Sequence, residues 1–510
     1  MKRASKKAKA GYVFGHAPRR CKRQPGPGTF PPNTVRLCAI VFAASISFLL
    51  PPLARAQNHP TTLPLDGLWV TTGYGELVEI KGNDLRVYEI TTLSCIPSEK
   101  ASRKTEAGTA DEIVFAADGD TFRIVPGPSK DTLWFHVDGT ISNLLLRRTS
   151  SQPKRCGQPL ADTPLTNYEV FWQTFAEQYA FFPLRNVDWR AIDKKVRPQV
   201  IPDTKPEELF RILSGMVEPL HDKHIYIDAP SIHKGFRGSR PPTDTLQDGD
   251  KPRVTEIIET KYVPGKLRDF CNGQLQLGRL RPPQGAMTTD SERKRQADLI
   301  EYLRIHSFAR YSKDDDFEKQ LAVLQAALDE IFEDAFHWSG LVIDIRINSG
   351  GFDQFGVAIA SRLATLDYFA WEKVARDDIR DPDHHTPPQP IMVHASQRPG
   401  FRGPVVLLTS AHALSAAETF TMALLGRDPH ITRIGANTQG VFSDELDRVL
   451  PNGWRFGLSN ETYLTKDGKS FEGTGVPPDI EVPIFPKEDL AEGRDSALDK
   501  VLEVLAHKAR

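Results

Sequence analysis

Ser415 has the sequence setting that best suits a nucleophile. It follows the apolar run 404–410 and begins a predicted helix over 415–425. A hydroxyl at the N-terminal end of a helix lies near the positive end of the helix dipole and near unpaired backbone amides, which would stabilise an oxyanion. The local alternative is structural, because Ser415 could be an N-cap whose capping box is completed by Glu418 three residues on.

A glycine pair supplies a second element of such a site. Gly350 and Gly351 follow an apolar predicted strand over 340–346 and precede a predicted helix over 352–366. Glycine tolerates backbone conformations in which N–H groups point into a cavity, as an oxyanion hole requires. The amides of Gly350 or Gly351 and of Ala416 are therefore the candidate oxyanion donors. A plain tight turn is the alternative.

A histidine, with its pKa near physiological pH, is a suitable general base for a serine nucleophile. His221 and His224 both precede the strand-like segment 225–227, and either could be that base. A solvated surface histidine is the alternative for each. His384 and His385 lie in a proline-rich stretch and are predicted to be solvated, so no metal or organic cofactor is indicated.

The segments that must position these residues alternate between strand and helix patterns. Such alternation predicts an α/β core with parallel strand pairs. A last helix is predicted from the stripe of Leu498, Val501, Leu502 and Leu505. The predicted core strands are 301–308, 340–346 and 404–410, and the predicted core helices are 317–336, 352–366 and 415–425.

The rest of the chain divides by composition. Residues 57–150 carry short apolar runs between Gly, Asn and Asp, which predicts a small antiparallel sheet or barrel with its aromatic residues in the core. Apolar residues recur at helical spacing within 160–228, which predicts a helical subdomain with a buried face. The remaining predicted parts are a loop-rich insert at 229–300, a catalytic core at 301–485 and a C-terminal helix at 486–510.

Residues 1–56 have the pattern of a secretory signal peptide. A basic stretch without acidic residues precedes the apolar run 37–50, and a small-x-small cleavage pattern ends at Ala56. We predict cleavage there and export to the periplasm or the outside, with an uncleaved anchor as the alternative. Cleavage would remove 11 of the 65 Lys and Arg and none of the 66 Asp and Glu, so the net charge would become −12. An acidic protein is a poor fit for nucleic acid, and no later run is long enough to cross a bilayer.

Three cysteines follow the predicted cleavage site: Cys95, Cys156 and Cys271. In an oxidising compartment a disulfide between Cys95 and Cys156 is favoured, because both flank the same β-rich segment. Cys271 would then be left unpaired. Three buried free thiols are the alternative.

Five motifs in order resemble those of the tail-specific or C-terminal processing serine proteases. The resemblance covers roughly 165–505 and implies an α/β protein with a crotonase-like βα catalytic core, preceded here by an N-terminal antiparallel β domain and a helical subdomain. The motifs are Leu-x-Asp-x-His at 220–224, Asp-x-Arg-x-Asn-x-Gly-Gly at 344–351, Ser-Ala-x-Glu at 415–418, Gly-x-x-Thr-x-Gly at 435–440 and Gly-x-x-Pro-Asp-Ile at 475–480.

One position separates the two catalytic branches of that family. Processing proteases carry a lysine base directly after Gly-x-x-Thr-x-Gly, and here Val441 stands in its place. The chain therefore resembles the tricorn-core and retinoid-binding-protein-like branch, in which a histidine is the base and a later glutamate completes the site. By this resemblance, His224 matches the position of the family's histidine base, and Glu472 matches the position of its glutamate. Lys223 replaces the serine that helps to orient the set in tricorn peptidases, and residues 230–300 lack the glycine-rich loop of a PDZ module.

The resemblance implies a serine peptidase that transfers an acyl group from a peptide or protein substrate to water. His224 would take the proton of Ser415, which would attack the scissile carbonyl, while Glu472 would polarise or position the site. No cofactor is implied. Two other classes share the fold: a non-catalytic binding protein for an apolar ligand or peptide, and a crotonase-like enzyme that acts on acyl thioesters. The oligomeric state does not follow from the sequence.

Overall fold

The computed structural model describes residues 65–508, apart from 105–111, 118–119, 241–245, 282–298, 379 and 382. The predicted signal peptide at 1–56 lies outside the described residues. Residues 63–510 form one compact unit. None of the described helices is both long enough and apolar enough to span a membrane.

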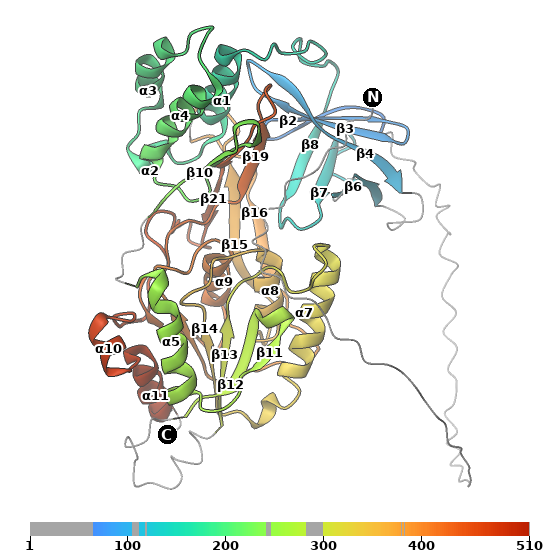
Figure 1. The fold of residues 1–510 in the computed structure, drawn as a ribbon. Coiled ribbons are helices and arrows are strands. Elements are labelled where there is room, and N and C mark those ends of the chain that lie inside the picture. The colour runs from blue at the N-terminus through green and yellow to red at the C-terminus, as the bar shows by residue number, and fades with distance from the viewer. Residues whose placement is uncertain are drawn as a thin grey trace, which may run out of the picture. The chain divides into compact units, whose positions relative to one another are not determined.

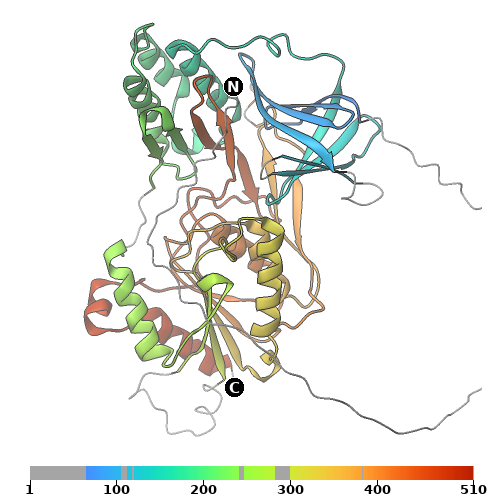
Figure 2. The ribbon, with the colours of Figure 1, turned by 45° about the vertical axis from the view of Figure 1, so that its right-hand side comes forward.

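The N-terminal β-rich segment is a closed antiparallel barrel (Figures 1 and 2). Consecutive strands pair with one another, and β8 closes the ring on β1. Alternate side chains point inward, so Trp69, Phe115 and Phe135 are buried in the barrel core, as the pattern predicts. The strands are β1 (Gly67–Thr71), β2 (Glu76–Lys81), β3 (Asp84–Ile90), β4 (Cys95–Lys104), β5 (Ile113–Ala116), β6 (Thr121–Pro126), β7 (Thr132–Val137) and β8 (Asn143–Thr149).

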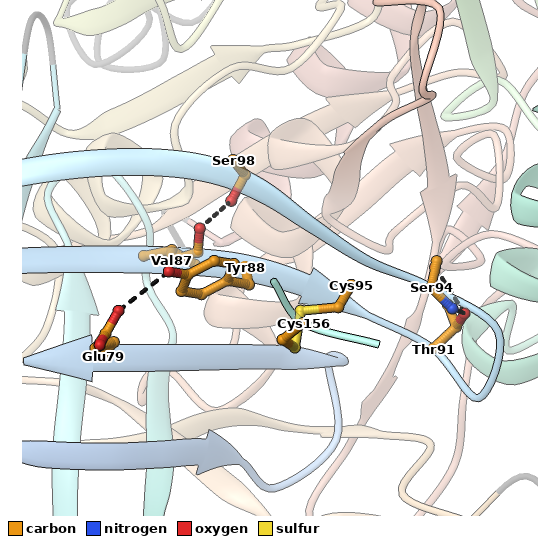
Figure 3. Close-up of a disulfide and its surroundings, with 8 residues drawn as sticks. All are labelled: Glu79, Val87, Tyr88, Thr91, Ser94, Cys95, Ser98 and Cys156. Carbon is orange, nitrogen blue, oxygen red and sulfur yellow. Dashed lines mark hydrogen bonds between the residues drawn. A yellow bond between two sulfur atoms is a disulfide. The ribbon is translucent and has the colours of Figure 1, made fainter. Parts of the chain in front are cut away.

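A disulfide ties the barrel to the segment that follows it. Cys95, the first residue of β4, is bonded to Cys156, and their Cα atoms are 4.9 Å apart (Figure 3). This confirms the predicted pairing, and Cys271 is a buried free thiol. The bond therefore closes a loop with a sequence separation of 61 residues.

Loss of this disulfide should destabilise the protein, because the cross-link restricts the unfolded chain. For a loop of this length we expect the Cys95→Ser, Cys156→Ser double variant to lose about 2–4 kcal/mol in free energy of unfolding. Urea denaturation of both proteins would measure the difference. Reductant should lower the midpoint of the parent and leave that of the double variant in place; equal midpoints for parent and variant would contradict the expectation.

A group of short helices follows the barrel. Thr163 caps the first of them, since its side chain accepts a hydrogen bond of 3.1 Å from the amide of Thr166. The predicted aromatic stripe is its buried face, with Phe171 and Phe175 packed against Phe456. The helices are α1 (Pro164–Gln178), α2 (Phe182–Arg185), α3 (Trp189–Val196) and α4 (Pro206–Val217), and a 3-10 turn follows at Glu218–Leu220.

The core is a mixed α/β sheet whose central strands are parallel, as the alternating pattern predicts. Helices cover both faces: α7, α8 and α9 pack on one side, and α5 and α11 pack on the other. The strand order is β11 (Arg268–Phe270), β12 (Leu275–Arg279), β13 (Ile300–Ile305), β14 (Gly340–Asp344), β17 (Val405–Thr409), β18 (Thr432–Gly435) and β22 (Ile480–Glu481). The helices of the core are α5 (Lys251–Ile257), α7 (Phe317–Ile331), α8 (Asp353–Ser361), α9 (Ala416–Leu425), α10 (Lys487–Glu492) and α11 (Ser496–Lys508).

The interval 229–300 holds more regular structure than its composition predicts. It contains α5 and the hairpin β11–β12, which extends the core sheet antiparallel from β13. The hairpin is stabilised because its apolar residues Leu275 and Leu277 are buried against the core. This burial depends on the tertiary fold, so the local composition, which is rich in Pro, Gly and charged residues, does not predict it.

Two further sheets were not evident in the sequence. A four-stranded sheet has the order β10, β9, β20, β19, and a three-stranded sheet has the order β16, β15, β21. Apart from β15, their strands have only four or five residues, and Pro390 lies within β16, so the sequence carries little periodicity there. The strands are β9 (Tyr226–Ala229), β10 (Lys234–Arg237), β15 (Tyr368–Ala375), β16 (Gln389–Val393), β19 (Glu445–Val449), β20 (Arg455–Ser459) and β21 (Glu461–Leu464).

Candidate active site

Ser415 lies at the turn between β17 and α9 in a strained backbone conformation. Its φ is 57° and its ψ is −125°, a region that residues with a Cβ rarely occupy. The surrounding chain holds it there: its amide donates to the carbonyl of Val441 over 3.0 Å, and a Cβ built at Gly350 would lie 2.7 Å from the Ser415 Cβ. Strain that is held in this way is typical of functional sites.

The Ser415 hydroxyl is not used as a helix cap. Its side chain makes no capping hydrogen bond within the described chain. Glu418 is equally unavailable for a capping box, because it accepts from the Thr438 hydroxyl (2.6 Å) and from the amides of Gly440 (2.6 Å) and Val441 (2.7 Å). Burial raises the pKa of Glu418 to about 7. The local structural alternative for Ser415 therefore does not describe this turn, and Glu418 instead ties the 438–441 loop to α9.

The glycine-rich turn offers one amide toward the nucleophile rather than two. Gly350 and Gly351 both have positive φ, 87° and 139°. The Gly350 amide donates to Oδ1 of Asn348 over 2.8 Å, which occupies it. No hydrogen bond within the described part of the chain uses the amide of Gly351 or of Ala416. Of the three predicted oxyanion donors, Gly351 and Ala416 have the free amides, whereas Gly350 is the close-packing residue beside Ser415.

The structure separates the two candidate histidines. His221 is exposed and terminates the 3-10 turn in a left-handed conformation. His224 is 6% exposed, and its amide donates to Oδ1 of Asp222 over 3.0 Å. The His224 Nδ1 is buried without a hydrogen-bond partner in the described structure. Burial lowers the pKa of His224, while the nearby carboxylates of Asp222 and Asp444 oppose that effect.

One cavity of about 830 Å³ brings the predicted nucleophile and one of the two predicted bases together. Ser415, His224 and Gly351 all line it, and His221 does not. The barrel contributes to the same wall, since Tyr74 also lines the cavity. A neutral imidazole, a serine hydroxyl and a free amide in one cavity can carry out acyl transfer.

Glu472 is not among the residues that line this cavity. It is 5% exposed; one carboxylate oxygen accepts from Nη2 of Arg185 over 2.6 Å and the other from the amide of Phe442 over 2.8 Å. Burial and the charge of Asp222 raise the pKa of Glu472 to about 8, against the effect of Arg185. The structure thus joins Glu472 to the loop that follows Val441 and gives it no direct hydrogen bond to His224 or Ser415.

Replacing Glu472 with Gln should slow catalysis without moving its pH dependence. The change keeps the shape of the side chain but leaves one acceptor oxygen in place of two, so either Arg185 or the amide of Phe442 loses its partner, which should shift the loop at Phe442. We expect a loss in kcat/KM of about 10² from this misplacement. The acid limb of the kcat/KM profile should stay where it is in the parent. A limb that moves down in the variant would instead mean that the carboxylate stabilises the imidazolium directly.

A buried cation beside the cavity has no counterpart among the predicted site residues. Lys373 on β15 is 0% exposed, and its Nζ bonds to Oδ2 of Asp444 (2.8 Å), to Oε2 of Glu461 (3.0 Å) and to the hydroxyl of Tyr463 (3.4 Å). The two carboxylates raise the pKa of Lys373 despite its burial. It therefore stays protonated and holds Asp444 and Glu461 at the cavity wall. The sequence signal that could have found it is a lysine inside the apolar run 369–375.

Three lysines near the motif residues in sequence could be considered as alternative bases. Lys466 and Lys469 are exposed in the turn after β21, and the Lys469 Nζ lies 4.6 Å from the ring centroid of Phe471. Lys223 does line the cavity, and burial lowers its pKa. Within the described chain no group of three or more His, Cys, Asp or Glu side chains is arranged to hold a metal ion.

Two segments of the chain match models of known protein families. Residues 300–482 match the model of peptidase family S41, and residues 161–218 match the model of the tricorn protease C1 domain. Over residues 300–482 the chain is thus similar to peptidase family S41.

Two relatives illustrate how far the similarity reaches. A protein named as a tricorn-like protease C-terminal subunit from Sulfurisphaera tokodaii is 29% identical over 184 residues, which is 34% of this chain and 18% of the relative. The chain thus spans about a fifth of the length of that curated relative. A crystal structure described as a peptidase of Parabacteroides merdae is 24% identical, with a TM-score of 0.53 over 68% of this chain and 97% of the other. The second similarity is one of fold.

Proposed function

We propose that this protein hydrolyses peptide bonds through an acyl-enzyme on Ser415. The observation that carries the proposal is the strained Ser415, with a hydroxyl free of capping bonds, in the same cavity as the buried His224. Nε2 of His224 takes the hydroxyl proton as the Oγ–carbon bond forms, and the amides of Gly351 and Ala416 bind the oxyanion. The proton then passes to the leaving amine, and water releases the acyl group by the same steps in reverse.

The finer assignments belong to the same proposal. Val441 in place of a lysine supports the tricorn-core and retinoid-binding-protein-like branch, in which His224 is the base and Glu472 positions the site. The parallel sheet with α8 and α9 on one face supports the crotonase-like βα core. The substrate would be a peptide or protein, cut in the manner of a tail-specific protease. No cofactor is needed for these steps.

We also propose that the mature protein is exported. The disulfide between Cys95 and Cys156 supports an oxidising compartment such as the periplasm or the cell exterior. The signal pattern in residues 1–56 supports the same location.

Labelling with a fluorophosphonate probe tests the function. An activated serine attacks the phosphorus, fluoride leaves and an Oγ–phosphorus bond forms, so peptide mapping should place the adduct on Ser415. Heat-denatured protein, which retains the residue without the site, is the control. A native protein that resists labelling would point to a non-catalytic binding protein for an apolar ligand or peptide. A labelled protein that cleaves acyl thioesters but no peptide would favour the crotonase-like alternative.

A further inference from the structure

One turn of the N-terminal barrel forms part of the wall of the catalytic cavity. The turn joins β7 to β8, and Gly139, Thr140 and Ile141 line the same cavity as Ser415 and His224. In both ribbon views the end of the barrel formed by β7 and β8 lies beside β16 (Figures 1 and 2). The barrel therefore contributes to the site, although it lies far from the nucleophile in sequence.

Specific contacts hold this turn against the core. The amide of Asn143 donates to the side-chain oxygen of Gln389 on β16 over 2.9 Å. The hydroxyl of Ser142 donates to Oε1 of Glu461 over 3.3 Å. Gly139, with φ of 89°, packs so closely on the ring of Phe352 that a Cβ would lie 3.3 Å from it. These contacts, made by Gly139, Ser142 and Asn143, fix the position of the turn against the core.

The turn presents an uncharged surface to the cavity. Its one charged residue, Asp138, is bound by Arg123 of the barrel, through hydrogen bonds of 2.6 Å and 3.0 Å. Ile141 is partly buried and packs on the same apolar cluster as Phe352, the residue after Gly351. Ile141 and Phe352 thus both line the cavity that also contains Gly351, whose amide is free, and part of a substrate must lie there during acyl transfer.

We propose that this turn and Phe352 form an apolar subsite that selects a substrate residue next to the scissile bond. The inference rests on the proposed peptidase function and deepens it. The ligand is an apolar side chain of an extended peptide, such as Leu, which would bury its surface against Ile141 and Phe352. The barrel is then a specificity element of the enzyme.

A selectivity ratio tests the subsite in the full chain. The substrates are peptides in which each residue on either side of the scissile bond is varied in turn among Leu, Ala and Lys. For the parent, the ratio of kcat/KM for Leu over Ala should be large at one position, and Ile141→Ala should reduce it about tenfold. Ile141→Asp should reverse the preference between Leu and Lys at the same position. The matched control is Ile113→Ala, a partly buried isoleucine in the barrel that packs on the barrel core, which should leave the ratio unchanged.

A ratio of rates within one protein does not depend on how much of that protein is folded, so destabilised variants still give an answer. The subsite proposal would be overturned if the selectivity ratios were unchanged in both Ile141 variants. It would also be overturned if Ile113→Ala lowered the Leu over Ala ratio as much as Ile141→Ala does. Fluorophosphonate labelling of the parent separates the two proposals. A parent that labels at Ser415 while the ratios stay unchanged refutes the subsite alone, whereas a parent that does not label refutes the peptidase function.

Discussion

Ser415→Ala should abolish peptide hydrolysis, with a loss in kcat of about 10⁶ if a complete nucleophile and base unit operates. The alanine keeps the Cβ that packs against Gly350 and the backbone bond to Val441, so the turn should survive. Ser415 supplies the hydroxyl at the start of α9, and alanine has no group that can replace it. Steady-state hydrolysis of the best peptide, with a folded variant verified by thermal unfolding, would measure the loss.

A serine at another helix start provides the matched control. Ser496 begins α11, and it is not among the residues that line the cavity. Ser496→Ala should change stability slightly and leave kcat within about twofold, since it removes a serine hydroxyl at the start of a helix that does not line the cavity. Undiminished turnover in a pure and folded Ser415→Ala protein would refute the peptidase function itself.

The sequence predicts the catalytic turns well because their signals are local. An apolar strand, a polar turn and a helix are adjacent in the chain, so Ser415 and Gly351 can be placed at helix starts without knowledge of the fold. The core strands β14 and β17 are buried on both faces and appear as continuous apolar runs. Local signals leave His221 and His224 both open, the family resemblance favours His224, and the packing of the chain decides which ring lines the cavity.

The remaining features of the site depend on distant contacts. Arg185 meets Glu472 across 287 residues, and Lys373 meets Asp444 and Glu461 across 71 and 88 residues. No periodicity or spacing encodes such pairs. The same holds for the barrel turn, whose Ser142 reaches Glu461 across 319 residues. A single sequence therefore yields the candidate nucleophile and its helix, while the charge network and the wall of the cavity require the structure.

His224→Ala should be nearly as damaging as the loss of Ser415, because nucleophile and base act as one unit. We expect a loss in kcat of at least about 10⁵ on the same substrate. His221→Ala is the matched control, since that ring is exposed and does not line the cavity, and it should retain parent activity. Equal sensitivity of the two variants would mean that the base has been assigned to the wrong histidine.

The pH dependence distinguishes this histidine from a lysine base. Protonated imidazole cannot accept the serine proton, so kcat/KM should fall on the acid side as His224 becomes charged. Burial lowers the pKa of His224 from its usual 6.5, which means that the neutral base persists to lower pH and the acid limb should lie below about 6.5. Lys223 shares the cavity, and burial lowers its pKa from 10.5, so a lysine base would place the limb well above that of a histidine. Lys223→Met should therefore leave the limb below 6.5. A limb near pH 8 to 9 that disappears in Lys223→Met would transfer the role of base to the lysine and leave Ser415 as the nucleophile.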